Sequence, residues 1–435
     1  MLIEFEKHIK NAHPELQDYS FLLACSGGVD SVVLAHLCNR LDLDFIIAHC
    51  NFNLRGTESD ADESLVKALG DKLKKKVFVS HFDTIGYINK NKVSVQMAAR
   101  ELRYAWFAEI MEEHHVKTLV TAHHADDNLE TFLINLSRGT GIEGLRGIPE
   151  KTDSIARPLL AFTREQIEAY AREEQISWRE DPSNTDPKYL RSRIRMELVP
   201  HLKGLHPMFM ENFAKTLGYV SGSASIVINY ITTLKKGLFK KEDSRLKIDI
   251  SSLLELEPVR AHLYELFKEY GFTEWDDVHG LLTAMSGKEV RSGTHRLLKD
   301  RDHLFLQAVP SVTSDTYGFS ITDLPGKLPV PMDVEPVERI TETSKKILYV
   351  DKETLNHRLQ VRKWRKGDYF YPMGMKGKKK VSKFFKDEKM DIISKEEQWL
   401  LCSRDAIVWV IGRRGDERFK VTENTSNILK FTINE

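Results

Sequence analysis

Short apolar runs alternate with helical patterns along the first third of the chain. Candidate strands lie at 21–25, 45–49, 77–79 and 118–122, and helical patterns run from about 94 to 114 and from about 126 to 136. Short apolar runs that are buried on both faces and separated by helices are typical of a parallel sheet covered on two sides. The pattern therefore predicts an α/β domain at the start of the chain.

The pattern changes after about residue 200. From there to about residue 310 it indicates mainly helices, and beyond residue 330 short β-type runs such as 347–350 and 406–411 recur. A chain of 435 residues is long enough for two to four domains. We predict three: an α/β catalytic domain over 1–205, a mainly helical domain over 206–320, and a small α/β or β-rich domain over 335–435.

Composition narrows the class of protein. Lys plus Arg and Asp plus Glu both total 64, which excludes a wholesale polycation but not a local basic patch. The first residues do not form a secretory signal, and no apolar run approaches the roughly 18 residues that span a bilayer. The four cysteines lie far apart without a CxxC pair, which argues against a disulfide scaffold, a zinc ribbon or an iron–sulfur cluster. We expect a cytoplasmic enzyme or binding protein that does not interact with membranes.

A glycine turn between a predicted strand and a predicted helix is the strongest chemical signal. It consists of Ser26, Gly27, Gly28, Val29, Asp30 and Ser31. Two glycines let the backbone approach a polyphosphate, and the start of the following helix offers N–H groups to an anion. Asp30 would repel phosphate unless a divalent cation lay between them, so we predict that it contacts Mg²⁺. The alternative is a tight turn with a serine cap; no segment matches the Walker A pattern.

Two further clusters carry candidate chemistry. Arg100 and Arg103 are three residues apart on a predicted helix and could hold phosphate oxygens, or could simply be solvated. In the segment 121–131, Asp127 and Glu130 share one helical face directly after two histidines. Neighbouring carboxylates favour a cation, either Mg²⁺ or an ammonium group, and a free lysine would suit such a pocket. Acids that complement a helix dipole, or a zinc site, are the alternatives.

Basic residues gather in two places. Arg191, Arg193 and Arg195 alternate, which fits RNA phosphates or a solvated face. Residues 362–389 hold eleven Lys or Arg against three acidic residues, an excess of eight, with aromatic residues between them. Charge for phosphates combined with aromatic surface suits structured RNA. The alternative is a lysine-rich solvated loop over a small core that contains those aromatics.

The motifs carry a family resemblance. The hexapeptide SGGVDS resembles the PP-loop of N-type ATP pyrophosphatases, a HUP-like parallel-sheet fold. The wider succession resembles the tRNA(Ile)-lysidine synthetase family over nearly the whole chain. It comprises SGGVDS (26–31), HCNFNLRG (49–56), ARELRY (99–104), TAHHADDNLET (121–131), RGTGIEGLRG (138–147), RPLL (157–160), DPSNTDPKYLRSRIR (181–195), GDYFYPMGMKG (367–377) and KVSKFF (380–385). Cys50, Phe52, Asn128 and Ser192 depart from the family pattern.

The resemblance implies a reaction. Members use ATP to adenylate the C2 oxygen of the wobble cytidine in a CAU-anticodon isoleucine tRNA, and the ε-amine of free L-lysine then displaces AMP. The product, lysidine, changes codon reading from AUG to AUA. A different PP-loop RNA-modifying enzyme, such as a tRNA thiolase, remains the alternative enzyme. An RNA-binding protein with a degenerate nucleotide fold is the non-enzymatic alternative. Whether the protein forms a homodimer stays open.

Carried over residue by residue, the resemblance assigns roles. Residues 26–31 would bind ATP, with Asp30 on Mg²⁺, and Asp127 and Glu130 would receive lysine. The implied catalytic residues are Asp30, Arg103, His123, Asp127 and Glu130, with Arg103, and less strongly Arg100, on the nucleotide or cytidine and His123 near the reacting phosphate. The implied tRNA-binding residues are Arg191, Arg195, Lys376, Lys378, Lys379 and Lys380.

Overall fold

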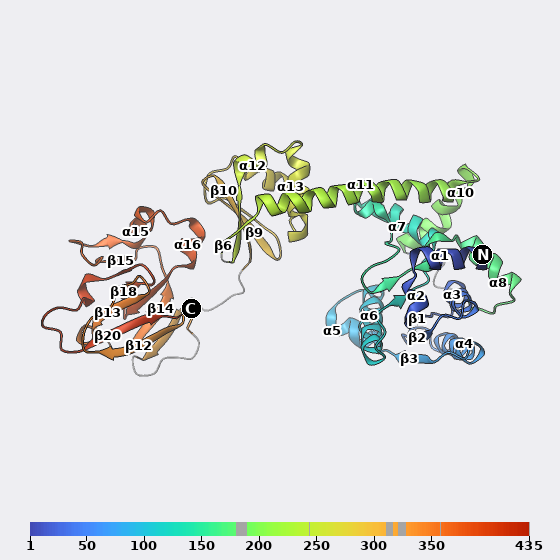
Figure 1. Cartoon of the computed structure of the whole chain (residues 1–435), viewed down its shortest axis with the longest axis horizontal. Coiled ribbons are helices and arrows are strands. Elements are labelled where there is room, and N and C mark those ends of the chain that lie inside the picture. The colour runs from blue at the N-terminus through green and yellow to red at the C-terminus, as the bar shows by residue number, and fades with distance from the viewer. Residues whose placement is uncertain (180–188, 243, 310–315, 321–327, 357, 435) are drawn as a thin grey trace. The chain divides into compact units, whose positions relative to one another are not determined.

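The structure, a computed structural model, describes residues 1–179, 189–242, 244–309, 316–320, 328–356 and 358–434. The described chain divides into two units, Met1–Asn229 and Tyr230–Glu435. The long helix α11 (Phe209–Leu238) begins in the first unit and ends in the second (Figure 1). Within the described residues, no helix combines the length and the apolar character needed to cross a membrane.

A parallel sheet forms the centre of the first unit (Figure 1). Its strand order is β3-β2-β1-β4-β5, and each neighbouring pair is parallel. The strands are β1 (Phe21–Ala24), β2 (Phe45–Asn51), β3 (Val77–His81), β4 (Leu119–Val120) and β5 (Ile155–Ala156). The α/β prediction is confirmed, and β5 is a strand that the sequence pattern did not indicate. The strands β1, β2 and β3 follow one another toward one edge of the sheet, whereas β4 and β5 lie on the other side of β1. Open parallel sheets bind ligands at such a point, where the strand order reverses.

Helices cover both faces of this sheet. Side chains of successive strand residues point to opposite faces. Phe21 and Leu23 of β1 therefore pack with α1 (Leu2–Ala12), α3 (Val29–Arg40), α4 (Thr57–Leu73) and α8 (Arg164–Glu173), whereas Leu22 packs with α6 (Val95–Glu113). The remaining α-helices of this unit are α2 (Glu15–Asp18), α5 (Thr84–Asn91), α7 (Ala125–Arg138), α9 (Leu190–Arg193) and α10 (Val199–Leu205). Short 3-10 helices lie at Gly144–Arg146 and Pro158–Ala161, and a π-helix at Ile194–Leu198.

The second unit contains an antiparallel sheet where mainly helices were expected. Helices do occur there: α12 (Ile250–Leu254), α13 (Val259–Phe267) and α14 (Trp275–Gly280). The sheet has the order β6-β7-β10-β9-β8, with β6 (Lys240–Glu242), β7 (Arg245–Asp249), β8 (Glu289–Arg291), β9 (His295–Asp300) and β10 (His303–Ala308). Its strands carry buried charged residues such as Arg296, which pairs with Glu396 at 2.5 Å, so their sequences do not look like apolar runs. The helical prediction therefore holds for the helices and omits this sheet.

The C-terminal part is rich in β-structure, as predicted. Its strands are β11 (Thr316–Ser320), β12 (Met332–Val337), β13 (Ile347–Asp351), β14 (Arg358–Lys363), β15 (Tyr369–Phe370), β16 (Lys379–Lys380), β17 (Trp399–Ser403), β18 (Ala406–Val410), β19 (Arg414–Gly415) and β20 (Ile428–Ile433). They form sheets β11-β14-β17-β18-β19, β12-β20-β13 and β15-β16. Two helices, α15 (Val381–Asp387) and α16 (Ile392–Glu397), accompany them. Phe370, Phe384 and Phe385 form a buried cluster beneath the basic segment.

Candidate active site and nucleic-acid interface

The glycine turn is held in shape by its own serines. The Ser31 hydroxyl donates to the carbonyl oxygen of Gly28 at 3.0 Å and accepts the backbone N–H of Ser26 at 3.1 Å. Gly27 has φ = +90°, a backbone conformation that residues with a Cβ rarely adopt. The helix α3 starts immediately afterwards, and its N-cap Gly28 provides no side chain to satisfy the first N–H groups. These N–H groups and the positive end of the helix dipole are available to an anion.

A cavity of about 590 Å³ opens beside this turn. Its lining combines acidic and basic side chains from several elements of the first unit. The polar members are Ser26, Asp30, Arg55, Asp62, His124, Asp126, Glu130, Arg164, Glu165, Glu168, Arg179, Arg195 and Lys203. Positive and negative groups at close range in one cavity suit a ligand that carries both phosphate and ammonium charges.

Asp30 projects into the cavity with one carboxylate oxygen unsatisfied. Oδ2 accepts a hydrogen bond from Arg164 Nη1 at 2.5 Å. Oδ1 is buried and has no hydrogen-bond partner among the described residues, and His124 Nε2 lies 3.7 Å from it. Burial raises the pKa of Asp30, although His124 and Arg164 oppose the rise. A buried carboxylate oxygen without a donor is suited to a hard cation such as Mg²⁺.

Asp127 and Glu130 are already paired within the chain. Arg195 donates to Asp127 Oδ1 at 3.2 Å and to both carboxylate oxygens of Glu130 at 2.6 and 3.0 Å. Arg191 Nε lies 3.2 Å from Glu130 Oε2, and its Nη2 donates to the Thr131 hydroxyl at 2.6 Å. The two carboxylates predicted to receive lysine and two arginines predicted to bind tRNA therefore form one ion-pair cluster.

The start of α7 fixes the position of these acids. The side chain of His124 accepts the Asp127 N–H at 3.4 Å, and Asp127 accepts the His124 N–H at 3.1 Å, a reciprocal helix cap. Burial raises the pKa of Asp127, but His124, His123, the backbone N–H of His124 and Arg195 together lower it more, so the net shift is downward. Burial raises the pKa of Glu130, which is only 1% exposed, and the hydrogen bonds from Arg195 only partly offset this rise.

The two histidines have different surroundings. His124 lies between the two halves of the site, with Nε2 3.7 Å from Asp30 Oδ1 and 3.4 Å from Asp127 Oδ2. His123 is hydrogen-bonded to the Thr121 hydroxyl at 2.9 Å, and burial lowers its pKa to about 4. The described cavity lining includes His124 and not His123. The cavity is therefore lined by His124, the neighbour of the predicted residue His123.

Arg100 and Arg103 do not line this cavity in the described structure. Both lie on α6 with exposed side chains. The Arg100 guanidinium stacks on Tyr104 at 4.9 Å, and that of Arg103 lies 5.3 Å from the ring centre of Phe52. Phe52, which departs from the family pattern, thus has a packing role beneath Arg103. A nucleotide contact by either arginine stays a prediction.

Sequence reasoning missed several basic residues of the cavity. Arg164 pairs with Asp30, and Arg179 pairs with Asp62 at 2.8 Å while its backbone N–H donates to the Gly27 carbonyl at 3.1 Å. Arg55 also reaches Asp62 at 2.8 Å. Arg55 lies in the quoted HCNFNLRG motif, so that motif carried a signal. Arg164 and Arg179 lie outside the motifs and only the fold brings them to the turn.

Two other motif positions have clear structural reasons. Asn128 Oδ1 accepts the backbone N–H of Ile148 at 2.7 Å. Gly147 has φ = +72°, and a Cβ there would lie 1.9 Å from that same oxygen. Asn128 and Gly147 therefore fix the glycine-rich loop onto α7. The first part of the segment 181–195, up to residue 188, lies outside the described residues.

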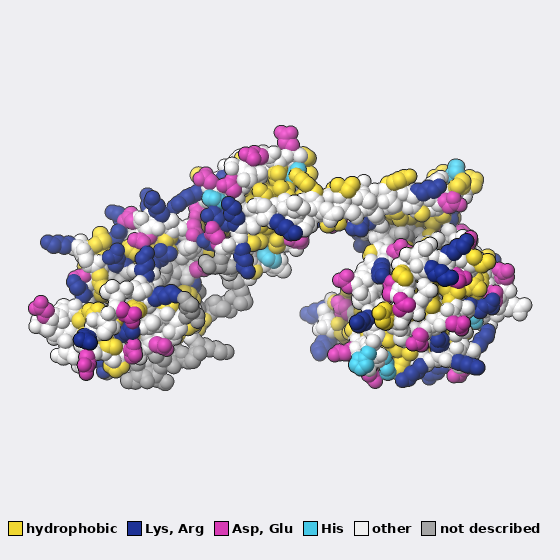
Figure 2. Space-filling model, viewed as in Figure 1, with side chains coloured by type: hydrophobic (Ala, Val, Ile, Leu, Met, Phe, Trp, Pro, Cys, Tyr) yellow, Lys and Arg dark blue, Asp and Glu magenta, His cyan; other side chains and the backbone are white. Residues whose placement is uncertain are grey.

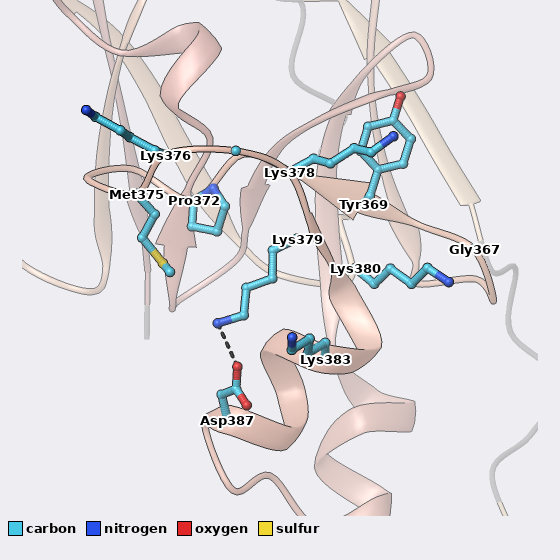
Figure 3. Close-up of a pocket in the computed structure, with 11 residues that line it drawn as sticks. Gly367, Tyr369, Pro372, Met375, Lys376, Lys378, Lys379, Lys380, Lys383 and Asp387 are labelled. Carbon is cyan, nitrogen blue, oxygen red and sulfur yellow. Dashed lines mark ion pairs between the residues drawn. The ribbon is translucent and has the colours of Figure 1, made fainter.

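The second unit holds a lysine-lined cavity of about 650 Å³. Figure 2 shows Lys and Arg side chains gathered over the region of α15 and β15. In the close-up, Lys379 points toward Asp387, 2.7 Å away, while Lys376 and Lys380 extend to opposite sides (Figure 3). Lys378 lies over the Tyr369 ring at 5.3 Å. The lining residues are Gly367, Tyr369, Pro372, Met375, Lys376, Gly377, Lys378, Lys379, Lys380, Lys383 and Asp387. Tyr369 is exposed, whereas the phenylalanines of this segment belong to the core.

Comparisons with known proteins match three parts of the chain and relate it to one family. Family models match residues 1–202 as a PP-loop domain, 241–309 as a TilS substrate binding domain and 359–431 as a TilS substrate C-terminal domain. A tRNA(Ile)-lysidine synthase of Parabacteroides distasonis is 40% identical, over 95% of each chain. A tRNA(Ile)-lysidine synthase of Bacteroides thetaiotaomicron is 35% identical over 98% of each chain, and one of Porphyromonas gingivalis is 37% identical over 96% of this chain and 95% of its own.

Proposed function

Because the chain belongs to the tRNA(Ile)-lysidine synthase family, we propose that it joins free L-lysine to the wobble cytidine of a CAU-anticodon isoleucine tRNA, using ATP. ATP first adenylates the C2 oxygen of the base, and pyrophosphate is released. The ε-amine of lysine then attacks C2, and AMP leaves with the former C2 oxygen. The resulting lysidine pairs with A instead of G, so the tRNA reads AUA in place of AUG.

One observation carries the proposal: a single cavity joins the glycine turn to the acidic start of α7. Ser26, Gly28 and Asp30 line it together with His124 and Glu130, and His124 Nε2 lies 3.7 Å from Asp30 and 3.4 Å from Asp127. The two steps require this adjacency, because the base that is adenylated in the first step is attacked by lysine in the second. Holding both reactants in one cavity makes the second step effectively unimolecular.

Residues 26–31 are proposed to bind the triphosphate. The N–H groups at the start of α3 are available to an anion, and Arg55, Arg164 and Arg179 line the adjoining cavity. Cations and N–H donors help most where negative charge builds up in the transition state, here on the phosphate oxygens. Asp30 would hold Mg²⁺ through Oδ1, and the ion would neutralise charge on the phosphates.

Asp127 and Glu130 are proposed to receive the ammonium groups of lysine. The attacking amine must be neutral, so a carboxylate has to accept its proton. The raised pKa of Glu130 suits this role, because a more basic carboxylate accepts a proton more readily. Arg195 now forms hydrogen bonds with both acids, so lysine binding requires this guanidinium to give up at least part of its contacts.

The tRNA is proposed to contact basic residues of both units. Arg191 and Arg195 would contact it in the catalytic unit, and Lys376, Lys378, Lys379 and Lys380 in the second unit. The lysine-lined cavity offers positive charge together with the exposed ring of Tyr369, the combination that phosphates and unpaired bases bind.

The test is an assay of both half-reactions with purified protein. ATP–pyrophosphate exchange is measured with a CAU-anticodon isoleucine tRNA transcript, with a methionine tRNA transcript of the same anticodon, and without tRNA. Labelled lysine is then added, and lysine in tRNA is compared with AMP released. We expect exchange that depends on the isoleucine transcript and one lysine incorporated per AMP. Sulfur incorporated from cysteine, or tRNA binding without AMP release, would contradict the proposal.

A further inference from the structure

A cluster of metal-ligand side chains lies outside the cavity described above. His8 belongs to α1, His13 directly follows it, and Glu150 lies in the loop before β5. His8 Nε2 lies 2.8 Å and His13 Nε2 3.4 Å from Glu150 Oε1. One ligand atom from each of the three residues lies within 4.8 Å of the others. No role in the proposed reaction uses these residues.

The polar atoms of this cluster are buried without aligned partners. His13 is completely buried, and neither of its ring nitrogens has a hydrogen-bond partner among the described residues. His8 Nε2 and Glu150 Oε1, which lie 2.8 Å apart as an ion pair, are also buried without an aligned hydrogen bond among the described residues. Buried polar atoms are normally satisfied. Ligands that converge on a shared cation would approach one another in this way.

The charges around the cluster favour a cation. Glu150 brings a carboxylate oxygen to the two imidazoles, and the three together offer the nitrogen and oxygen donors that a metal ion binds. The second ring nitrogen of His13, Nδ1, faces Glu15 Oε1 at 3.9 Å, and Glu15 is anchored by Lys151 at 2.6 Å. At 3.9 Å this carboxylate forms no hydrogen bond with the ring, and it supports a metal-bound imidazole through its negative charge.

The cluster is also accessible. A cavity of about 200 Å³ is lined by His8 and Glu150 together with Ala125 and Asn128 of α7. An ion and a water molecule could reach these two partly exposed residues through it. The fully buried His13 would complete the site from within.

We propose that His8 Nε2, His13 Nε2 and Glu150 Oε1 bind one Zn²⁺ ion, with water from the small cavity as the fourth ligand. Two imidazoles and one carboxylate form a donor set that zinc prefers, whereas Mg²⁺ and Ca²⁺ favour oxygen ligands throughout. The ion ties the end of α1 to the loop before β5. The same loop is held to α7 by the hydrogen bond from Ile148 to Asn128. The metal therefore stabilises the loop that packs against α7.

The primary test needs no variant. The full-length protein is stripped with a chelator and titrated with Zn²⁺, while bound metal is measured by mass spectrometry and ligation by X-ray absorption. We expect one zinc per chain, nitrogen and oxygen ligands with imidazole scattering, and a melting temperature that rises with added zinc. Sulfur scattering, or binding of less than about half an equivalent at micromolar zinc, would overturn the proposal.

Variants locate the ion. Glu150→Gln and His8→Gln should each abolish stoichiometric binding and the zinc-dependent melting shift, and two variants guard against one that fails to fold. Glu15→Gln should weaken zinc affinity by about 10- to 100-fold. The matched control is His81→Gln, because His81 Nε2 makes a 2.8 Å contact with Glu63 without a second histidine. Unchanged zinc binding in Glu150→Gln and His8→Gln, or a loss in His81→Gln alone, would contradict this site.

Discussion

The cavity in the first unit and the lysine-lined cavity in the second hold their charges in opposite ways. In the first, Glu130 is 1% exposed and receives three contacts from Arg195 and Arg191. In the second, Lys376, Lys378 and Lys380 are exposed, and Lys379 has one ion pair, with Asp387. Charges interact strongly in buried surroundings and weakly at a salt-screened surface. Single substitutions should therefore switch off the first site and only weaken the second.

The largest effect is expected from Asp30→Asn. The substitution removes the anionic charge that is proposed to hold Mg²⁺ and that pairs with Arg164. Removing one preorganised electrostatic partner of a transition state commonly costs about 10²–10³ in rate, and we expect ATP–pyrophosphate exchange to fall by at least that factor. Affinity for tRNA should stay nearly unchanged. Asp44→Asn, at an exposed carboxylate before β2, is the control. Retained exchange together with a large loss of tRNA affinity would refute the metal role of Asp30.

Glu130→Gln should act on lysine rather than on ATP. A hydrogen bond to a charged group contributes about 1.5–3 kcal/mol, which corresponds to a 10- to 100-fold rise in KM for lysine. Pyrophosphate exchange should change little, because the glycine turn is left intact. Glu165→Gln is a matched control, since Glu165 lines the same cavity but is exposed and pairs with Lys203 at 2.7 Å. Equal rises in KM for lysine in the two variants would contradict a specific role of Glu130 in lysine recognition.

The sequence predicted the local parts of both sites and not their assembly. The glycine turn could be identified because its residues are contiguous between a strand and a helix. The basic surface could be identified because eleven positive residues fall within 28 positions, 362–389. The pairing of Asp30 with Arg164 joins positions 134 residues apart, and that of Glu130 with Arg195 joins positions 65 apart. No periodicity encodes such contacts, because they depend on how the helices pack on the sheet.

The same reason explains why the sheet of β6 to β10 was not predicted. The strands β6 to β10 are short, and buried polar residues such as Arg296 and Gln307 interrupt their apolar pattern. Arg296 is tolerated because Glu396, 100 residues away in sequence, compensates its charge, and such a partner is not visible locally. His123 and His124 are adjacent in sequence, so only the start of α7 decides which one faces the cavity. The His8, His13 and Glu150 cluster likewise exists only in the folded chain.

A pH experiment tests whether His123, which lies beside the first site, is buried in its neutral form. Burial lowers the pKa of His123 from 6.5 to about 4, so the unfolded chain takes up a proton at a higher pH than the folded one. The free energy of unfolding should therefore fall as pH drops from about 6.5 toward 4, by about 2 kcal/mol between pH 8 and pH 5. Urea unfolding at both pH values measures the difference in wild type and in His123→Gln. Between pH 8 and pH 5 the free energy of unfolding of His123→Gln should fall by about 2 kcal/mol less than that of the wild type. An equal fall in both proteins would mean that His123 is not buried in its neutral form.

The smallest effects are expected on the lysine-lined cavity, where they should be graded. An exposed lysine that contacts phosphate contributes about 0.2–1 kcal/mol, so Lys380→Gln should weaken tRNA binding by less than about five-fold. It should also reduce the slope of log affinity against log salt by about 0.9. Lys379→Gln should reduce that slope less, because Asp387 already neutralises part of its charge. Lys345→Gln, at an exposed lysine before β13, controls for net charge. The triple variant replaces Lys378, Lys379 and Lys380 with Gln. If neither Lys380→Gln nor the triple variant changes the salt slope of tRNA binding, these residues form only a solvated surface, because phosphate contacts cannot be lost without changing counterion release.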